Sequence, residues 1–210
     1  MKKDALKVLV ACEESQAVTI AFRNLGFTAF SNDILECSGG HPEWHIQGDA
    51  IEQAYSGRWD VMIAHPPCTH LSVSGARWFT EGRKPLYLRE DALYFVFQLM
   101  VAPIPHIAIE NPVSIISGSI TKATQTINPY QFGHKEQKKT SLWLFDLPKL
   151  HETDNVYEEM MKLPERERQR IHWLPPSKDR AKLRSKTFTG IAQAMAQQWG
   201  DYLVEKYGLI

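Results

Sequence analysis

Two short motifs in this sequence carry residue types that could perform covalent chemistry. Pro67-Cys68 and Glu110-Asn111 each follow a short apolar run. A cysteine held behind a pair of prolines is a candidate nucleophile when nearby positive charge favours its thiolate. A carboxylate beside an apolar run is costly to bury unless it is paired or used. The plainer alternatives are an inert buried thiol and a paired structural carboxylate.

The apolar pattern around these motifs predicts strands that alternate with helices. Continuous apolar runs, typical of strands buried on both faces, cover residues 8–12, 27–32, 59–64, 106–110 and 140–145. Helical spacing of apolar residues covers 16–25, 91–100, 187–206 and, in a shorter stretch, 156–163. This alternation predicts an α/β fold with a mostly parallel sheet.

Polar side chains gather where the predicted strands end. These positions are Glu13-Glu14-Ser15, Asp33, Asp49, Pro67-Cys68 and Glu110-Asn111. Ligands of such sheets bind at the carboxyl ends of the strands. We therefore expect Cys68 and Glu110 to face a common ligand.

Length and composition limit the class of protein. The chain has 210 residues, which suits one domain, and 24 basic residues balance 24 acidic ones. A globally basic nucleic-acid coat protein is thereby excluded, so nucleic-acid contact would come from local patches. Three cysteines do not make a disulfide framework. We find no signal segment or membrane span and expect a cytoplasmic protein without membrane partners.

The ordered set of motifs resembles the cytosine-C5 DNA methyltransferases, especially their small phage and prophage members. That family has a Pro-Cys nucleophile after one strand and a Glu-Asn pair after the next. Further matches are Gln131-Phe132-Gly133-His134, Lys138-Lys139-Thr140, Arg184-Ser185-Lys186-Thr187 and Gly190-Ile191. The resemblance covers about residues 7–145 and 184–203. It implies a Rossmann-like class I methyltransferase fold.

The resemblance also implies catalytic roles. Cys68, behind Pro67, would add to cytosine C6 and so make C5 able to attack a methyl sulfonium. Glu110, followed by Asn111, would hold cytosine N3 and the 4-amino group. Lys138, or Lys139 next to it, would take the part of the family's arginine at cytosine O2. The base must leave the helix stack to reach such a pocket.

S-adenosyl-L-methionine is the cofactor that the resemblance implies. Asp33 would accept the ribose hydroxyls and Asp49 would lie near the adenine amino group, although a turn aspartate or a helix N-cap are alternatives. The other candidate cofactor residues are Glu14, Ser15, Ile34, Ala50, His65 and Thr187. The family's glycine-rich first motif is replaced by residues 11–16, which contain no glycine.

DNA, double- or single-stranded, is the expected substrate. Residues 1–145 would form the catalytic and cofactor core, 146–183 a small basic insert in place of a target-recognition region, and 184–210 a helix returning to the core. Residues 166–186 hold eight basic and two acidic residues with Trp173 among them, which suits phosphate contact and weak sequence discrimination, or simply a solvated face. The candidate nucleic-acid residues are Arg77, Arg83, Lys84, Lys138, Lys139, Arg180 and Arg184.

Other interpretations stay open at this point. A related enzyme could act on a free pyrimidine nucleotide such as dCMP, or a non-catalytic homologue could bind cofactor or DNA without transfer. An amino-methyltransferase and a Cys–His hydrolase using Cys68 with His65 or His70 are weaker alternatives. Zinc at Cys37, His41 and His45 lacks a fourth ligand, so no metal is expected. The sequence leaves the oligomeric state open.

Overall fold

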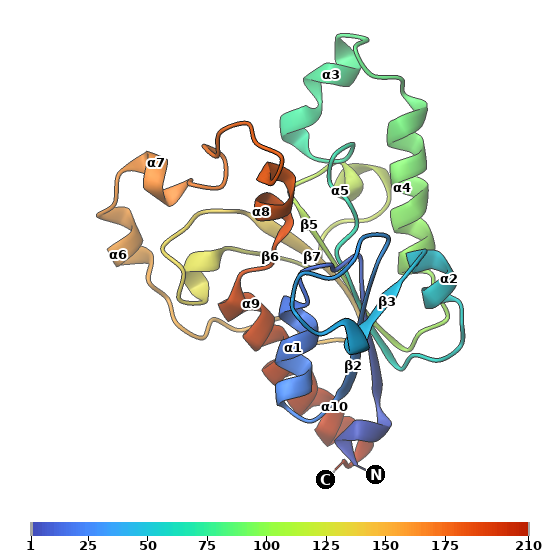
Figure 1. Cartoon of the computed structure of the whole chain (residues 1–210). Coiled ribbons are helices and arrows are strands. Elements are labelled where there is room, and N and C mark those ends of the chain that lie inside the picture. Colours follow the sequence, from blue (N-terminus) through green and yellow to red (C-terminus); the bar gives the residue numbers. More distant parts are fainter. Residues whose placement is uncertain (1, 210) are drawn as a thin grey trace.

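The computed structural model describes residues 2–209, with the side chain of Ser74 left out. Within this part of the chain, seven strands form one sheet in the order β3-β2-β1-β4-β5-β7-β6 (Figure 1). The strands are β1 (Lys7–Ala11), β2 (Thr28–Asp33), β3 (His45–Gln47), β4 (Val61–Ala64), β5 (His106–Pro112), β6 (Gln125–Ile127) and β7 (Thr140–Phe145). Strand β7 runs antiparallel to both of its neighbours, and the other adjacent pairs are parallel. The predicted α/β fold with a mostly parallel sheet is confirmed.

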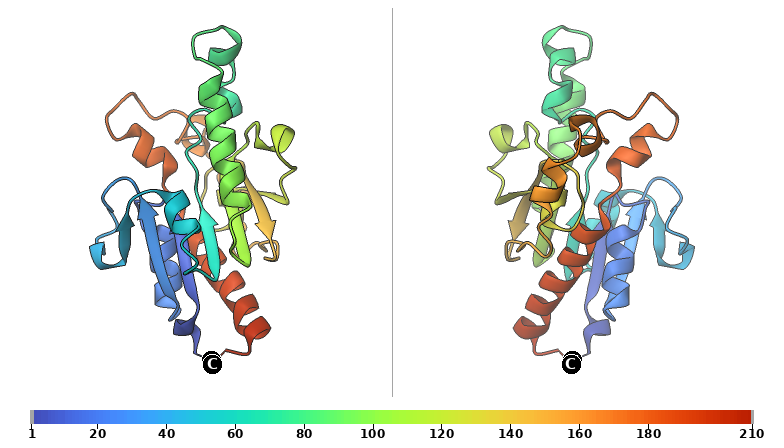
Figure 2. Two further views of the ribbon diagram at one scale, coloured as in Figure 1. Left: turned by 90° about the vertical axis from the view of Figure 1, so that its right-hand side faces the viewer. Right: turned by 90° about the vertical axis from the view of Figure 1, so that its left-hand side faces the viewer.

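Helices cover both faces of the sheet (Figures 1 and 2). One face carries α1 (Ala17–Asn24), α9 (Thr189–Ala194) and α10 (Gly200–Tyr207), with a π-helical turn over Met195–Trp199 between the last two. The other face carries α2 (Ala50–Ala54), α4 (Tyr87–Met100) and α5 (Ile116–Ser119). The remaining helices are α3 (Arg77–Thr80), α6 (Tyr157–Met161), α7 (Glu165–Arg168) and α8 (Arg180–Ser185).

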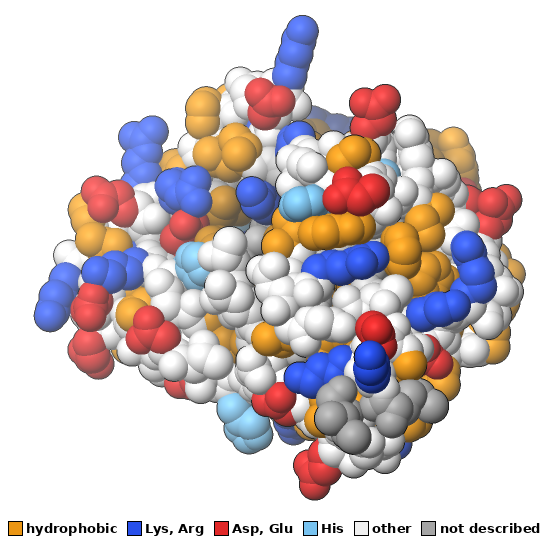
Figure 3. All heavy atoms as spheres, turned by 60° about the horizontal axis from the view of Figure 1, so that its bottom comes forward, with side chains coloured by type: hydrophobic (Ala, Val, Ile, Leu, Met, Phe, Trp, Pro, Cys, Tyr) orange, Lys and Arg blue, Asp and Glu red, His pale blue; other side chains and the backbone are white. Residues whose placement is uncertain are grey.

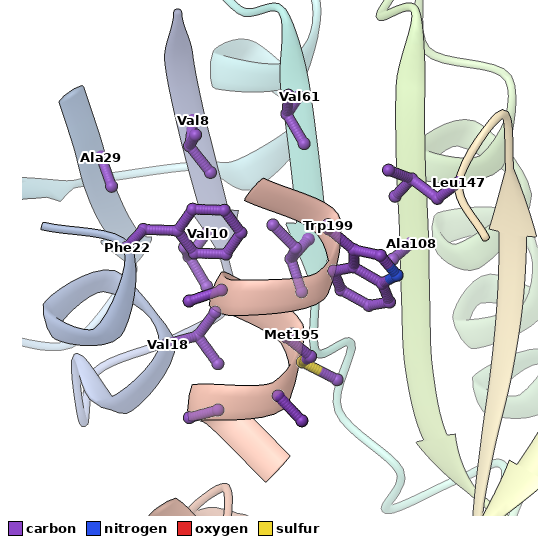
Figure 4. Packing of buried hydrophobic residues seen from close by; sticks show 14 of the residues in the cluster. Val8, Val10, Val18, Phe22, Ala29, Val61, Ala108, Leu147, Met195 and Trp199 are labelled. Atoms are coloured by element: carbon purple, nitrogen blue, oxygen red, sulfur yellow. The ribbon is translucent and has the colours of Figure 1, made fainter. Parts of the chain in front are cut away.

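Alternate residues of the central strands pack on opposite faces of the sheet. Val8 and Val10 of β1 join Phe22 of α1 and Trp199 of the π-helical turn in one hydrophobic cluster (Figure 4). Leu9, which lies between the two valines, joins the second cluster beneath α2 and α4. Since side chains of a strand point alternately to its two faces, a strand between two helical layers must be apolar throughout. This explains the continuous apolar runs of the sequence.

The C-terminal helix is anchored to the sheet by a buried histidine. His106 of β5 is fully buried, and its Nε2 lies 2.7 Å from the hydroxyl oxygen of Tyr207 in α10. Its Nδ1 lies 2.8 Å from the carbonyl oxygen of Asp146, which directly follows β7. Both ring nitrogens therefore have partners, and residues far apart in the sequence are held at one end of β5.

Most predicted elements are present, with differences at their ends. The strand over 140–145 has the predicted bounds, while the helix predicted from residue 91 begins at Tyr87. Glu110, predicted as the last residue of its strand, and Asn111, predicted to follow it, both lie within β5 because this strand stays paired with β7 as far as Pro112. A strand end was predicted near Asp49, which follows β3, but without bounds. Strand β6 and helix α2 were not predicted, since three to five residues carry too little periodicity.

Charge is distributed evenly over the end of the molecule where both termini lie. Positive and negative side chains are interspersed on the face seen in Figure 3. This agrees with the balance of 24 basic and 24 acidic residues. No helix within residues 2–209 combines the length and apolarity that crossing a membrane requires.

Gly190, at the start of α9, permits a close contact between two distant segments. A Cβ at this position would lie 1.9 Å from the carbonyl oxygen of Phe132. The backbone N–H of Gly190 also donates to His134 Nε2 at 3.0 Å. Any larger residue would push residues 132–134 away from α9, because the clashing atom belongs to the backbone.

We therefore expect Gly190→Ala to lower the free energy of unfolding by about 1–3 kcal/mol, the usual cost of overpacking. Gly118→Ala is the matched control, because a Cβ at Gly118 in α5 meets nothing within 4 Å. Urea denaturation of both variants measures the difference. Equal stability of the two variants would contradict the close contact.

Candidate active site

Cys68 lies just beyond β4 in a segment fixed by Asn111. The Asn111 side chain is buried, and its Nδ2 donates to the carbonyl oxygen of Pro66 at 2.7 Å. The carbonyl of Cys68 accepts the backbone N–H of Leu71 at 3.1 Å, so a turn begins at the cysteine. Asn111 thus ties the end of β4 to β5 and positions the half-buried thiol.

Glu110 faces His65 across the same pair of strands. His65 Nδ1 lies 3.1 Å from Glu110 Oε2, and the two side chains are 8% and 15% exposed. We expected His65 near a cofactor, but the structure places it against Glu110. His65 Nε2 is buried and has no hydrogen-bond partner.

The His65–Glu110 pair sets the protonation state of both groups. Burial favours the neutral form of each, but the hydrogen bond and the opposite charge outweigh it. They raise the pKa of His65, with a further contribution from Glu13, and they lower the pKa of Glu110, with a further contribution from Lys138. The hydrogen bond and the opposite charges thus favour the imidazolium form of His65 and the carboxylate form of Glu110.

Glu13 is a site residue that the sequence reasoning left out of the candidate set. Its carboxylate accepts the backbone N–H of Val18 at 2.7 Å and the Thr19 hydroxyl at 2.8 Å, at the N-terminus of α1. The residue is 4% exposed, and burial raises its pKa. The one signal for Glu13 in the sequence is its place within residues 11–16, directly after the first predicted strand. Only the fold shows that Glu13, and not the adjacent Glu14, binds the N-terminus of α1.

The turn between β1 and α1 adopts left-handed backbone without glycine. Cys12 and Gln16 have φ angles of 59° and 58°, which is uncommon for residues with a Cβ. The fully buried Gln16 side chain binds the backbone of His41 twice, accepting its N–H at 3.0 Å and donating to its carbonyl at 2.8 Å. These bonds hold the strained turn against the loop that follows β2.

Asp33 and Asp49 lie near the end of β1. Burial and the charges of both carboxylates, in that order, raise the pKa of Cys12 to about 12. Asp33 Oδ1 accepts the N–H of Leu35 at 3.0 Å, and Asp49 Oδ1 accepts the N–H of Ile51 at 2.6 Å as the N-cap of α2. The turn and N-cap alternatives are both realised, and each carboxylate keeps a second oxygen for a ligand.

The other expected cofactor residues differ in their accessibility. Glu14 Oε2 is buried without a hydrogen-bond partner, and Lys182 Nζ of α8 lies 3.8 Å away. Ser15 and Thr187 are half-buried, Ala50 is buried, and Ile34 is 73% exposed. The orphaned Glu14 oxygen and the open oxygens of the two aspartates fit a ligand rich in ammonium and hydroxyl donors.

Of the two neighbouring lysines, Lys138 is the one whose charge acts on the thiol. Lys138 Nζ donates to the carbonyl oxygen of Arg184 at 2.9 Å, while Lys139 is exposed. Burial raises the pKa of Cys68, the charges of Lys138 and Arg184 lower it, and Glu110 raises it. Burial prevails, so the resting group is a thiol, and the two cations are the groups that favour its ionisation.

The remaining basic candidates occupy two elements around the site. Arg77, Arg83 and Lys84 lie on the arm formed by residues 73–93, which projects beyond the sheet (Figure 2). There the guanidinium groups of Arg77 and Arg83 lie 4.7 and 5.1 Å from the centroid of the Trp78 ring. Arg180 and Arg184 lie on α8, and only Arg184 acts on the thiol.

The zinc alternative finds no support in the geometry. His45 uses both ring nitrogens, Nδ1 lying 2.8 Å from Ser31 Oγ and Nε2 lying 2.9 Å from the Leu35 carbonyl. His41 pairs with Glu43. Throughout residues 2–209, no group of three or more His, Cys, Asp or Glu side chains is arranged to hold a metal ion.

Replacing Lys138 should make Cys68 harder to ionise. Because the positive charge lowers the pKa of this thiol, Lys138→Gln raises it and moves the pH profile of Cys68 alkylation by iodoacetamide to higher pH. Lys139→Gln is the control, as its side chain is exposed. Mass spectrometry of the Cys68 peptide separates this thiol from Cys12 and Cys37. Coincident profiles for both variants would refute the interaction.

Comparison with known proteins gives a structural likeness only. No protein-family model and no curated protein matches the chain. Among solved structures, the Entamoeba histolytica methyltransferase EhMeth is similar with a TM-score of 0.51 and 16% identity, over 72% of this chain and 57% of the other.

Two further structures are similar at lower TM-scores. A protein described as a DNA modification methyltransferase encoded within an E. coli prophage has a TM-score of 0.44 and 13% identity, over 76% of this chain and 56% of its own. S. pombe Dnmt2 methyltransferase has a TM-score of 0.46 and 13% identity, over 83% and 61%. The chain thus spans less than two thirds of each structure. Together with the strand order, the likeness to EhMeth shows that this chain has a Rossmann-like class I methyltransferase fold.

Proposed function

We propose that the protein is an S-adenosyl-L-methionine-dependent methyltransferase that acts on cytosine C5 in DNA through a covalent adduct with Cys68. The observation that carries this proposal is the convergence of three groups from different strand ends. The charges of Lys138 and Glu110 both act on the Cys68 thiol, at the sheet edge where α/β proteins bind ligands.

Cys68 supplies the nucleophile. Its thiolate forms a bond from Sγ to cytosine C6, and the electron pair of the C5–C6 double bond moves into the ring, which makes C5 nucleophilic. Methyl transfer to C5 would release S-adenosyl-L-homocysteine as the leaving group. Water then takes the C5 proton, and the electron pair of that C–H bond re-forms the C5–C6 double bond and expels the Cys68 thiolate from C6. Because burial keeps the resting group a thiol, ionisation depends on Lys138 and Arg184.

Glu110 recognises the base. Held as an anion by His65, its carboxylate would accept a hydrogen bond from the 4-amino group. As the thiolate adds to C6, N3 takes a proton from water, and Glu110 accepts a hydrogen bond from the new N3–H, which stabilises the electron density delivered to the ring. Lys138, on the other side of the thiol, would place its positive charge near cytosine O2. Asn111 would position the Cys68 segment and would not react with the substrate, since its side-chain amide donates to the Pro66 carbonyl.

The cofactor site is proposed for the ends of β1, β2 and β3. S-adenosyl-L-methionine supplies an electrophilic methyl group when bound. Glu14 would accept its ammonium group through the orphaned Oε2, Asp33 would accept ribose hydroxyls and Asp49 the adenine amino group. Ser15, Ile34, Ala50 and Thr187 would line the same site, and His65, which pairs with Glu110 through Nδ1, would line it through Nε2.

DNA contact is proposed for the arm of residues 73–93 and for α8, which lie on either side of the thiol. Arg77, Arg83 and Lys84 would contact phosphates from the arm, and Arg180 and Arg184 from α8, with Lys139 exposed beside Lys138. Phosphate contacts position a nucleic acid without reading its sequence. We therefore expect a weak sequence preference and binding that weakens steeply with salt.

Methyl transfer from labelled S-adenosyl-L-methionine tests the proposal. Cytosine-containing DNA should gain label as 5-methylcytosine with the wild-type chain, and Cys68→Ala should reduce transfer to background because the adduct cannot form. Cys68→Ser is the conservative companion, since a hydroxyl is a far weaker nucleophile at the same position.

Each other outcome assigns a different function. Label found in dCMP alone would indicate an enzyme of free nucleotides. Cofactor binding without transfer to either substrate would indicate a non-catalytic homologue. Transfer that survives Cys68→Ala would rule out the covalent mechanism and favour an amino group as the acceptor.

Removing His65 should shift the acid limb of the pH profile. His65 lowers the pKa of Glu110, so His65→Gln raises that pKa and the carboxylate protonates at higher pH as the solution is acidified. The acid limb of kcat/KM should then move to higher pH, with activity regained at alkaline pH. His151→Gln is the matched control, as His151 is exposed and contacts Gln198 through its backbone. An unmoved acid limb would refute the role of His65.

A further inference from the structure

An open hollow of about 520 Å³ lies on the segment between β7 and α9, apart from the thiol. Its lining combines an aromatic ring, aliphatic side chains and cations. Trp173 is 56% exposed, although an indole is among the most costly side chains to leave in water. Leu163 and Pro175 provide the aliphatic walls, and Arg166 and Arg170 lie at the rim. An exposed ring in a hollow of this size suits a flat aromatic ligand.

Among the described residues that line the hollow, the ion pairs leave one cation, Arg166, and one carboxylate, Glu167, without an ion partner. Arg170 pairs with Glu136 at 2.8 Å, and Lys135 pairs with Glu159 at 2.6 Å. Arg166 has no carboxylate oxygen within 4 Å among the residues that the structure describes. The guanidinium of Arg166 can therefore bind an anionic group of a ligand whose ring lies on Trp173.

The hollow adjoins the candidate active site. Glu136, which lines it, is two residues from Lys138, so their Cα atoms are at most about 7 Å apart. The backbone N–H of Gln137 donates to the Arg168 carbonyl at 2.7 Å, which joins α7 to this segment. His172, next to Trp173, has its pKa lowered by burial and by the charges of Arg184 and Lys138. The same two cations, Lys138 and Arg184, thus act both on the Cys68 thiol and on the residue next to Trp173.

We propose that this hollow is a stacking site for an unpaired nucleobase next to the target cytosine, with Arg166 contacting the phosphate of that nucleotide. The inference rests on the proposed function, because it takes the ligand to be a nucleic acid. Stacking on an indole tolerates any base, since every base has a π face. A base within a duplex cannot lie flat on Trp173, so the site selects single-stranded or locally opened substrate.

Equilibrium binding of a fluorescein-labelled single-stranded oligonucleotide with one cytosine tests this site. Abasic residues are placed in turn at each position flanking the cytosine, and Kd is measured by anisotropy for the wild-type chain and Trp173→Ala. The matched control is Tyr94→Ala, because Tyr94 on α4 is also an exposed aromatic, at 62%. Trp173→Phe keeps a ring and should restore most of the affinity.

We expect one abasic position to weaken wild-type binding by about tenfold, the order of one base–aromatic stack. Trp173→Ala should weaken binding of the intact strand by a similar factor and should be insensitive to the abasic residue at that position. Tyr94→Ala should behave as the wild type. Duplex of the same sequence should bind wild type and Trp173→Ala alike.

Two outcomes would overturn the inference. In the first, Trp173→Ala binds the intact strand as tightly as wild type. In the second, its abasic profile matches that of wild type. Neither depends on methyl transfer, so failure of the stacking site is distinguishable from failure of the proposed reaction. Absence of any nucleic-acid binding by the wild-type chain would remove the DNA substrate and this site together.

Discussion

The buried ion pair between His65 and Glu110 is the interaction on which the site depends. Burying either charge alone would be prohibitively costly, and each stabilises the other at 3.1 Å. Glu13 and Lys138 extend the pair, so that negative and positive groups alternate from β1 through β4 and β5 to the start of β7. Four separate segments are coupled by charge at the carboxyl edge. Removing one of these charged groups would leave its neighbour without an opposite charge. The four residues therefore constrain one another along this edge of the sheet.

The turn after β1 adopts left-handed backbone at two residues, and neither of them is glycine. Left-handed backbone at Cys12 and Gln16 carries a steric cost. Hydrogen bonds from Gln16 to His41 and from Val18 and Thr19 to Glu13 offset that cost. Side-chain hydrogen bonds therefore hold the backbone of residues 11–16 in this conformation, which a glycine would reach through its greater conformational freedom. These contacts also bring the loop after β2 against the turn, and Glu14 keeps a buried oxygen that makes no hydrogen bond and has Lys182 Nζ 3.8 Å away.

The segment between β7 and α9 is held to the core through backbone contacts near the proposed catalytic residues. Gly190 packs on the Phe132 carbonyl, Lys138 donates to the Arg184 carbonyl, and Gln137 donates to the Arg168 carbonyl. These contacts fix the backbone of α7 and α8 close to Lys138. The proposed reaction and the proposed stacking site give this short segment two roles, a charge for the thiol and a surface for the neighbouring nucleotide.

The sequence by itself determined the layered fold and the chemical types at its edge. Strands buried between two helical layers must be continuously apolar, so β1, β4, β5 and β7 and the motifs of Cys68 and Glu110 could be located from pattern alone. Tertiary structure decided which of those residues meet. His65 lies against Glu110, the charge of Lys138 acts on the Cys68 thiol, and Glu13 is buried and hydrogen-bonded while Glu14 keeps a buried oxygen without a hydrogen bond. Two adjacent residues of the same type cannot be distinguished by their pattern in the sequence. Their burial and the charges around them differ, because these depend on neighbours from other strands.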